Sequence, residues 1–160
     1  MSVQDEAKSN DKTAVFCRNY GNHLEEAVSV GESHPARRIV FRSRKKWVSV
    51  RHALDAHGPR RIYFAVIDDS AEIKFTARLD DVILSPSLDD PETQRALEEY
   101  QIKGTEGEGT WQNEVETLYL ISNCQPVESF PFTDLNKLND GEPLDENYRH
   151  SYALVQARNL

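Results

Sequence analysis

Residues 60–79 read RRIYFAVIDDSAEIKFTARL, and they dominate the fold prediction. The part from Arg61 to Asp68 is rich in β-branched and aromatic residues, which favour a strand. After a short polar turn, apolar and polar residues alternate from Glu72 to Leu79, as in a strand with one buried and one solvent-facing side. We therefore expect an antiparallel hairpin in which Phe75 and Ala77 face the core.

Shorter helices and strands are expected on both sides of this hairpin. Helical spacing of apolar residues, or start and stop signals in the chain, predict helices at residues 23–30, 48–57, 90–100 and 133–138. Apolar runs predict further strands at residues 14–18, 37–42, 115–124 and 151–157, and residues 126–131 are expected to cross between elements. No β–α–β series recurs, so a doubly wound sheet is disfavoured. The expected fold is α+β: a small curved, mostly antiparallel sheet or an open β-barrel with flanking helices.

The chain is 160 residues long, the length of one ordinary domain. We expect residues 1–12 to be a disordered polar tail and residues 13–160 to form a single α+β domain. No run of eighteen apolar residues is present, and the N-terminus lacks the apolar segment of a secretory signal. The two cysteines, Cys17 and Cys124, are expected to be buried free thiols. These features predict a soluble, cytoplasmic protein without membrane contact.

Charge is distributed unevenly along the chain, whose net charge is −8. Residues 37–61 hold nine basic side chains against one acid, Asp55, whereas residues 80–116 hold eleven acids against two bases. A segment so rich in positive charge can attract a polyanion even when the whole chain is acidic. The nine predicted nucleic-acid-binding residues are Arg37, Arg38, Arg42, Arg44, Lys45, Lys46, Arg51, Arg60 and Arg61.

Aromatic residues are interleaved with this basic segment. Arginines that contact phosphate, together with rings that stack on bases, are typical of proteins that bind single-stranded or extruded bases. Phe41 and one of Tyr63 and Phe64 are expected in the core, whereas Trp47, beside the sequence RSRKK, is expected to be exposed. The competing interpretation is a solvated surface whose arginines pair with the many acids of this chain.

No catalytic signature stands out. The acidic pairs at residues 68–69, 80–81 and 89–90 fall in predicted turns, where Asp bonds its own backbone. The five histidines form no HxH or HxxxH pair, so no metal site is predicted. The sequence GTEGEG at residues 104–109 lacks the GK[ST] ending of a phosphate-binding loop. We therefore predict no catalytic residue and no cofactor, and an enzymatic function is left open.

Three segments together resemble the PUA-like superfamily, which includes EVE, ASCH and YTH domains. They are KKWVSVRHALDAHGPRRIYFAVIDDSAEIKFTARLDDVIL at residues 45–84, VETLYLISNCQPVESFPFTDLNKL at residues 115–138, and the closing strand SYALV. The resemblance covers residues 37–157. It implies an open barrel with flanking helices, and a pocket in which an aromatic side chain holds a flipped or modified base. Trp47 and Trp111 are the pocket residues that it suggests, whereas the GxKxxExR pattern of ASCH domains is missing.

The resulting hypothesis is a non-enzymatic module that recognises RNA or DNA through residues 37–61, with Trp47, Trp111 and Tyr63 as base-stacking or pocket residues. One alternative is an accessory domain whose acidic segments, 80–116 and 139–146, bind a basic protein partner. A second alternative is a small-molecule hydrolase with a barrel pocket. A continuous positive groove would favour the first function, and arginines paired with acids would favour the accessory domain. A pocket that gathers an acid, a base and a nucleophile would favour the hydrolase.

Overall fold

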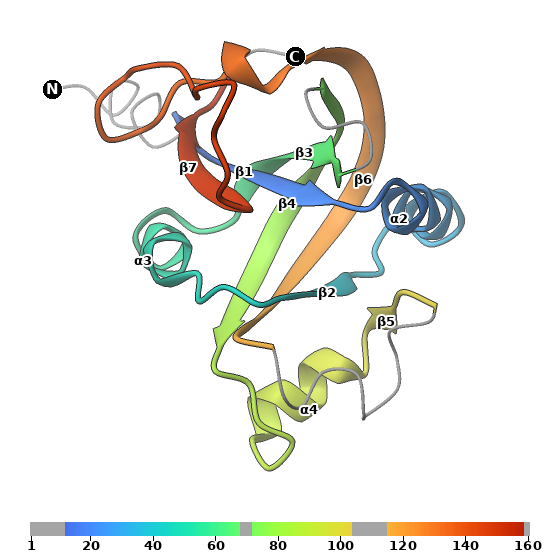
Figure 1. The fold of residues 1–160 in the computed structure, drawn as a ribbon. Coiled ribbons are helices and arrows are strands. Elements are labelled where there is room, and N and C mark those ends of the chain that lie inside the picture. The colour runs from blue at the N-terminus through green and yellow to red at the C-terminus, as the bar shows by residue number, and fades with distance from the viewer. Residues whose placement is uncertain (1–11, 68–71, 104–114, 159–160) are drawn as a thin grey trace, which may run out of the picture.

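A computed structural model describes residues 12–67, 72–103 and 115–158 (Figure 1). In this part of the chain seven strands form one mixed, open sheet in the order β5-β2-β6-β4-β3-β1-β7. The strands are β1 (Thr13–Asn19), β2 (Ile39–Ser43), β3 (Arg60–Val66), β4 (Glu72–Leu84), β5 (Tyr100–Gln101), β6 (Thr117–Pro131) and β7 (Tyr152–Gln156). The helices are α2 (Gly21–Ser33), α3 (Val48–His57) and α4 (Pro91–Leu97), followed by one 3-10 turn, η3 (Phe132–Asp134).

The expected α+β class is confirmed, and most neighbouring strands are antiparallel. The pairs β3–β4, β4–β6, β2–β6 and β1–β7 run antiparallel, whereas β1–β3 and β2–β5 run parallel. The predicted central hairpin is present, with Phe64 opposite Phe75 and Arg61 opposite Arg78. Strand β4 continues to Leu84, but its pairing with β3 ends at Leu79, and the residues after it pair with β6.

One bulge alters how β4 presents its apolar side chains. Phe64 pairs with Phe75 but the next residue, Ala65, pairs with Ile73, so β4 carries one extra residue at this point. Phe75 and Ala77 pack in the main core as predicted, whereas Ile73 joins a second cluster on the other side of the sheet. The uniform alternation could not reveal this, because an inserted residue switches the side to which all following side chains point.

The main core lies on the inner side of the sheet, between α2 and α3. Figure 1 shows these two helices on either side of the region between β1 and β2. Leu24 of α2 and Val50 of α3 are fully buried in this cluster, together with Phe41 of β2. Tyr152 Oη, from the edge strand β7, donates to the carbonyl of Lys46, just after β2, at 2.9 Å. The sheet therefore curves until segments near its two edges meet.

Two smaller clusters cover the outer side of the sheet near its two ends. One packs the segment after η3 against β1 and β3, with Phe132, Leu135 and Tyr63 among its members. The other places Ala96 of α4 against Leu120 of β6. Between these clusters the middle of the outer side is left to polar side chains.

The third helix is shorter than expected. Its start is as predicted, because the side chain of Asp90 accepts a hydrogen bond from the N–H of Glu92 at 3.1 Å and Pro91 occupies the first helical position. It ends at Leu97, which is only half-buried, and Tyr100 belongs to β5, which pairs in parallel with β2. The two-residue strand is too short to leave a periodic signal.

Two predictions about the C-terminal half were wrong. Residues 126–131 do not cross between elements but continue β6, which pairs with β4 as far as Pro131. Pro126 is tolerated there because the register between the two strands is irregular beside it. The helix expected at residues 133–138 is only the 3-10 turn at Phe132–Asp134.

Some predictions fall on parts of the chain outside the described residues. Residues 1–11 of the expected tail are among them, and so is the GTEGEG sequence at residues 104–109. Within the described residues, no helix is long and apolar enough to cross a membrane. Both cysteines are free and buried, as predicted.

Candidate functional site

The nine basic residues of the segment 37–61 do not share one surface. At the start of β2, Arg38 forms an ion pair with Glu99 at 3.1 Å, and the guanidinium of Arg37 lies 5.5 Å from the centre of the Tyr100 ring. At the other end of β2, Arg42 Nη2 donates to Gln101 Oε1 at 2.7 Å. These three arginines therefore connect the β2 region to β5 and to Glu99 just before it.

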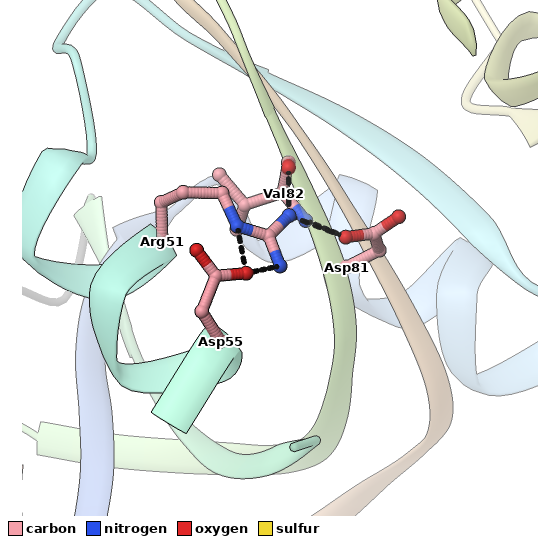
Figure 2. Close-up of polar contacts among 4 residues, drawn as sticks. All are labelled: Arg51, Asp55, Asp81 and Val82. Atoms are coloured by element: carbon pink, nitrogen blue, oxygen red, sulfur yellow. Dashed lines mark hydrogen bonds and ion pairs between the residues drawn. The ribbon is translucent and has the colours of Figure 1, made fainter. Parts of the chain in front are cut away.

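Arg51 lies at the centre of a polar network between α3 and β4 (Figure 2). Its guanidinium contacts Asp81 Oδ1 at 2.6 Å and Asp55 Oδ1 at 2.8 Å, and it also donates to the carbonyl of Val82. Burial alone would lower the pKa of Arg51, but the hydrogen bonds to Asp81 and Asp55 raise it above its ordinary value. Arg51 therefore fixes α3 against β4 and has few donors left for an external phosphate.

Arg60 and Arg61 lie beyond the C-terminal end of α3, away from the lysines before its start. Arg60 donates to the carbonyls of Pro59 at 2.8 Å and His57 at 2.9 Å, which caps the end of the helix. Arg61 is exposed on β3, opposite Arg78. Because α3 has ten residues, about 15 Å separates its two ends. The basic residues of this segment are therefore spread along β2 and over both ends of α3, and several of them have partners within the fold.

Trp47 is fully buried, which corrects the expectation that it is exposed. Its ring stacks on Tyr119 with centroids 4.4 Å apart and on Tyr152 at 4.9 Å, and its indole N–H donates to Ser43 Oγ at 3.0 Å. A large ring immediately before α3 turns under the helix because that position offers two aromatic neighbours. Trp47 cannot stack on an external base without leaving this core.

Tyr63 is also buried, so its expected role in base stacking is corrected too. Its hydroxyl donates to the carbonyl of Arg158 at 3.2 Å and accepts from the N–H of the same residue at 2.9 Å. Phe41 is in the core as predicted, and Phe64 is buried beside it. Trp111 lies outside the described residues.

A cavity of about 570 Å³ opens beside the start of α3 and the edge strand β7. Its volume falls within the range of about 300–1,000 Å³ that is usual for small-molecule sites. We call it the α3–β7 cavity. Its wall is formed by Lys45, Lys46, Ser49, Lys137, Leu138, Asn139, Tyr148, His150, Ser151, Tyr152, Ala153 and Leu154.

The charged side chains of this wall are all basic. Lys45 and Lys46 are exposed, and neither forms an ion pair within the described residues. Lys137 contacts Asp140 at 3.1 Å, but no carboxylate lines the cavity itself. Ser49 is the second residue of α3, whose first turn has neither an acidic residue nor a side-chain cap. The positive end of the helix dipole therefore adds to the lysines, and an anion is favoured here.

Hydrogen bonds from β6 and β7 hold the backbone of the two lysines in place. Thr117, fully buried on β6, donates to the carbonyl of Lys45 at 2.7 Å and accepts from the N–H of Trp47 at 3.1 Å. The hydroxyl of Tyr152 holds the carbonyl of Lys46. The backbone that carries these lysines is thus fixed from both β6 and β7.

The opposite wall is formed by the chain just before β7. Tyr148 Oη donates to the carbonyl of Tyr152 at 3.0 Å, and Arg18 donates to the carbonyls of Tyr148 and His150. The guanidinium of Arg18 is itself packed over the ring of Phe132 at 5.2 Å. Burial raises the pKa of both tyrosines, so each ring remains an uncharged phenol near neutral pH.

The cavity does not contain the arrangement expected of a hydrolase. Ser151 Oγ is buried and has no hydrogen-bond partner within the described residues, so no base activates it. The part of the chain described by the structure also contains no group of His, Cys, Asp or Glu residues suited to hold a metal ion.

Comparisons with protein-family models, curated proteins and solved structures gave no match for this chain. Sequence reasoning found Lys45 and Lys46, but it missed the wall formed by Tyr148 and Tyr152. That wall lies beside Lys45 and Lys46 only because β7 pairs with β1, and no local sequence pattern marks it.

Proposed function

We propose that this protein is a non-enzymatic module that binds single-stranded RNA or DNA, with one nucleotide held in the α3–β7 cavity. The observation that carries the proposal is the composition of the cavity wall, which combines lysines and tyrosines and has no carboxylate. Nucleotides present an anionic phosphate next to a flat base, and the wall offers a complementary group to each.

The phosphate is assigned to the side of the cavity near α3. Lys45 and Lys46 supply charge, and the uncapped first turn of α3 adds backbone donors next to Ser49. None of these groups is neutralised by a neighbouring acid within the described residues. This end of the site therefore attracts the backbone of any sequence and provides no selection among bases.

The base is assigned to the side near β7, where Tyr152 and Tyr148 line the wall. Tyr152 is held rigidly because Trp47 stacks on it, so little conformational entropy is lost on binding. A base that enters a cavity must leave its stack, which suits a single strand or a flipped or modified base. The curvature that joins β7 to the segment after β2 supports our interpretation of the sheet as an open barrel of PUA-like type.

The ion pairs of Arg38 and Arg51 favour the alternative function, an accessory domain that binds a basic partner. Acidic side chains of α4 such as Glu92 are exposed and available for such a partner. We rank this function second because charge pairs of this kind are common on folded proteins, whereas a carboxylate-free cavity in a chain of net charge −8 is not expected from its composition. The two buried free thiols suit the cytoplasm, the compartment that we propose.

Fluorescence anisotropy with labelled single-stranded RNA, single-stranded DNA and duplex at low salt tests the proposal. We expect both single strands to bind more tightly than the duplex. The double variant Lys45→Gln/Lys46→Gln should weaken binding of every sequence. Tyr152→Ala should weaken binding to the single strands by roughly 1–3 kcal/mol, the usual contribution of one stacked base.

The matched control is the double variant Lys12→Gln/Lys103→Gln, which removes the same charge at two exposed lysines that do not line the cavity. It should bind nearly as the unmodified protein does. Circular dichroism establishes that each variant is folded. If no oligonucleotide binds saturably at tens of micromolar, or if the control loses as much affinity as the cavity variant, the accessory-domain function takes precedence.

A further inference from the structure

The middle of the sheet's outer side carries a second basic surface, distinct from the α3–β7 cavity. Two apolar clusters cover the ends of this side, and the uncovered part between them includes a cleft of about 300 Å³. We call it the outer-face cleft. Strands β3, β4 and β6 line it with Arg60, Arg61, Thr76, Arg78, Asn123 and Gln125, and no carboxylate is among its lining residues.

Two of these arginines face each other directly. Arg61 of β3 and Arg78 of β4 are partners in the antiparallel register, so their Cβ atoms are about 4.5–5.5 Å apart. Like charges in such a position repel each other and destabilise a sheet. Arg61 is exposed, and it has no hydrogen bond or ion pair within the described residues. An anion between the two guanidinium groups would offset this repulsion.

The hydrogen bonds around the cleft leave donors available on two of its lining residues. Arg78 Nε donates to Asp80 Oδ1 at 3.0 Å, which leaves its two terminal nitrogens available on a side chain that is 62% exposed. Gln125 Nε2 donates to Asn123 Oδ1 at 2.9 Å, so the oxygen of that amide is occupied and its nitrogen remains as a donor. Asn123 has a positive φ of 54°, a conformation that Asn tolerates, at a register shift between β4 and β6.

We propose that the outer-face cleft binds a phosphate group between Arg61 and Arg78, with the Asn123 amide as a third donor. A phosphate fits better than a carboxylate because its tetrahedral oxygens can accept from two guanidinium groups at once. This site is independent of the nucleotide cavity. The group can belong to a free phosphate compound or to the backbone of a nucleic acid, since both offer the same oxygens.

NMR of the ¹⁵N-labelled protein tests the proposal, with phosphate and pyrophosphate titrated against sodium chloride at constant ionic strength. We expect saturable shifts of the amides of Arg61, Thr76 and Arg78, whereas a shift at Ser49 reports separately on the α3–β7 cavity. Arg61→Gln and Arg78→Gln should each weaken binding by roughly 10- to 100-fold, as expected for a lost charge-assisted hydrogen bond. The control is Arg95→Gln, which removes an exposed arginine from α4 and should bind as before.

Thermal unfolding provides a second readout that does not depend on the ligand. Without phosphate and at low salt, Arg61→Gln should melt at the same temperature as the unmodified protein or higher, because the repulsion is removed. Added pyrophosphate should raise the melting temperature of the unmodified protein more than that of the variant. A variant that melts lower without phosphate would make Arg61 a structural residue and overturn the proposal.

The oligonucleotides used for the cavity identify the source of the phosphate. A single strand that displaces pyrophosphate from the outer-face amides assigns the site to a nucleic-acid backbone, and pyrophosphate binding without displacement assigns it to a free phosphate compound. The amide shifts separate the two sites, because those of Ser49 and Tyr152 report on the α3–β7 cavity and those of Arg61 and Arg78 report on the outer-face cleft. Absence of saturable shifts at Arg61 and Arg78, or equal shifts with chloride, overturns the phosphate site whatever happens in the cavity.

Discussion

At the scale of single residues, Trp47 links the core to the proposed binding wall. Its ring lies between Tyr119 and Tyr152, and Tyr152 in turn lines the α3–β7 cavity. A rigid ring behind a binding wall reduces the entropy that the wall loses when a ligand is bound. The residue is therefore expected to influence binding from inside the core, without contact with the ligand.

Replacement of this ring gives the first prediction. Trp47→Ala should lower the free energy of unfolding by about 3–5 kcal/mol, because it leaves a cavity between two tyrosines. Urea unfolding followed by circular dichroism measures the loss. Val48→Ala is the control, since Val48 is the next residue but is 41% exposed, and its change should be below about 1 kcal/mol. Equal losses in the two variants would contradict the buried position of Trp47.

The two thiols give a prediction about alkaline pH. Burial raises the pKa of Cys17 and of Cys124 from 9.0 to about 12. Between these values the unfolded chain has lost the thiol protons while the folded protein keeps them, so stability is retained below pH 9 and falls as pH rises toward 12. Each thiol should contribute a slope of roughly 1.4 kcal/mol per pH unit.

Urea unfolding at several pH values between 8 and 11 measures this slope. Cys17→Ala and Cys124→Ala should each make the decline less steep, and the comparison removes the contribution of tyrosines that titrate in the same range. At pH 8 iodoacetamide should leave both thiols unmodified in the folded protein and react with both in urea. Rapid alkylation of the folded protein would contradict the burial of these side chains.

At the scale of elements, the pairing of β6 with β2 positions the basic wall of the cavity. Thr117 begins β6 and binds the backbone on both sides of Lys46, through the carbonyl of Lys45 and the N–H of Trp47. The segment between β2 and α3 has no regular structure of its own to fix its backbone. The orientation of the lysines thus depends on the hydroxyl of Thr117, together with that of Tyr152 on β7.

Thr117→Val tests this dependence, because it removes the hydroxyl and keeps the shape of the side chain. Two backbone groups lose their partner, so stability should fall by about 1–3 kcal/mol, and binding of single strands should weaken at a temperature where the variant is folded. Thr93→Val is the matched control, since Thr93 is equally buried and its hydroxyl accepts from Ser87 N at 3.2 Å in the region of α4. That variant should lose stability without losing affinity. Equal affinity in both variants would show that Thr117 does not position the lysines.

The elements that the sequence predicted well are those whose signal is local. The central hairpin follows from the apolar run at residues 61–68 and the alternation after it, and α3 was predicted with its observed bounds because Gly58 ends it. The elements that it missed depend on partners far along the chain. Strand β5 exists only because β2 lies beside it, and β6 runs through Pro126 because β4 is long enough to pair with it.

At the scale of the whole molecule, the same distinction explains the candidate site. A count of charges along the chain identified Lys45 and Lys46, because a count needs no three-dimensional information. It also gathered arginines that the fold then separates, such as Arg38 beside Glu99 and Arg51 beside Asp81. The tyrosine wall follows Lys46 by more than a hundred residues, and only the closure of the curved sheet brings the two together.

This difference between the linear and the folded distribution of charge leads to a quantitative prediction for salt dependence. Binding to a single strand changes log K by about 0.7 per neutralised phosphate for each unit of log salt. A surface formed by all nine basic residues of the segment 37–61 would make roughly nine phosphate contacts and would give a slope of about −6. The α3–β7 cavity offers Lys45, Lys46 and Lys137, so we expect a slope of roughly −2.

Anisotropy titrations of one labelled strand between 20 and 200 mM salt, on the order of one decade, measure this slope directly. Lys45→Gln/Lys46→Gln should reduce the magnitude of the slope to below about 1. Tyr152→Ala should lower affinity and change the slope less, because stacking releases no counterions and Thr117 still holds the backbone on both sides of Lys46. A measured slope steeper than about −5 would mean that the separated arginines also contact the strand, and the site would then have to extend well beyond the cavity.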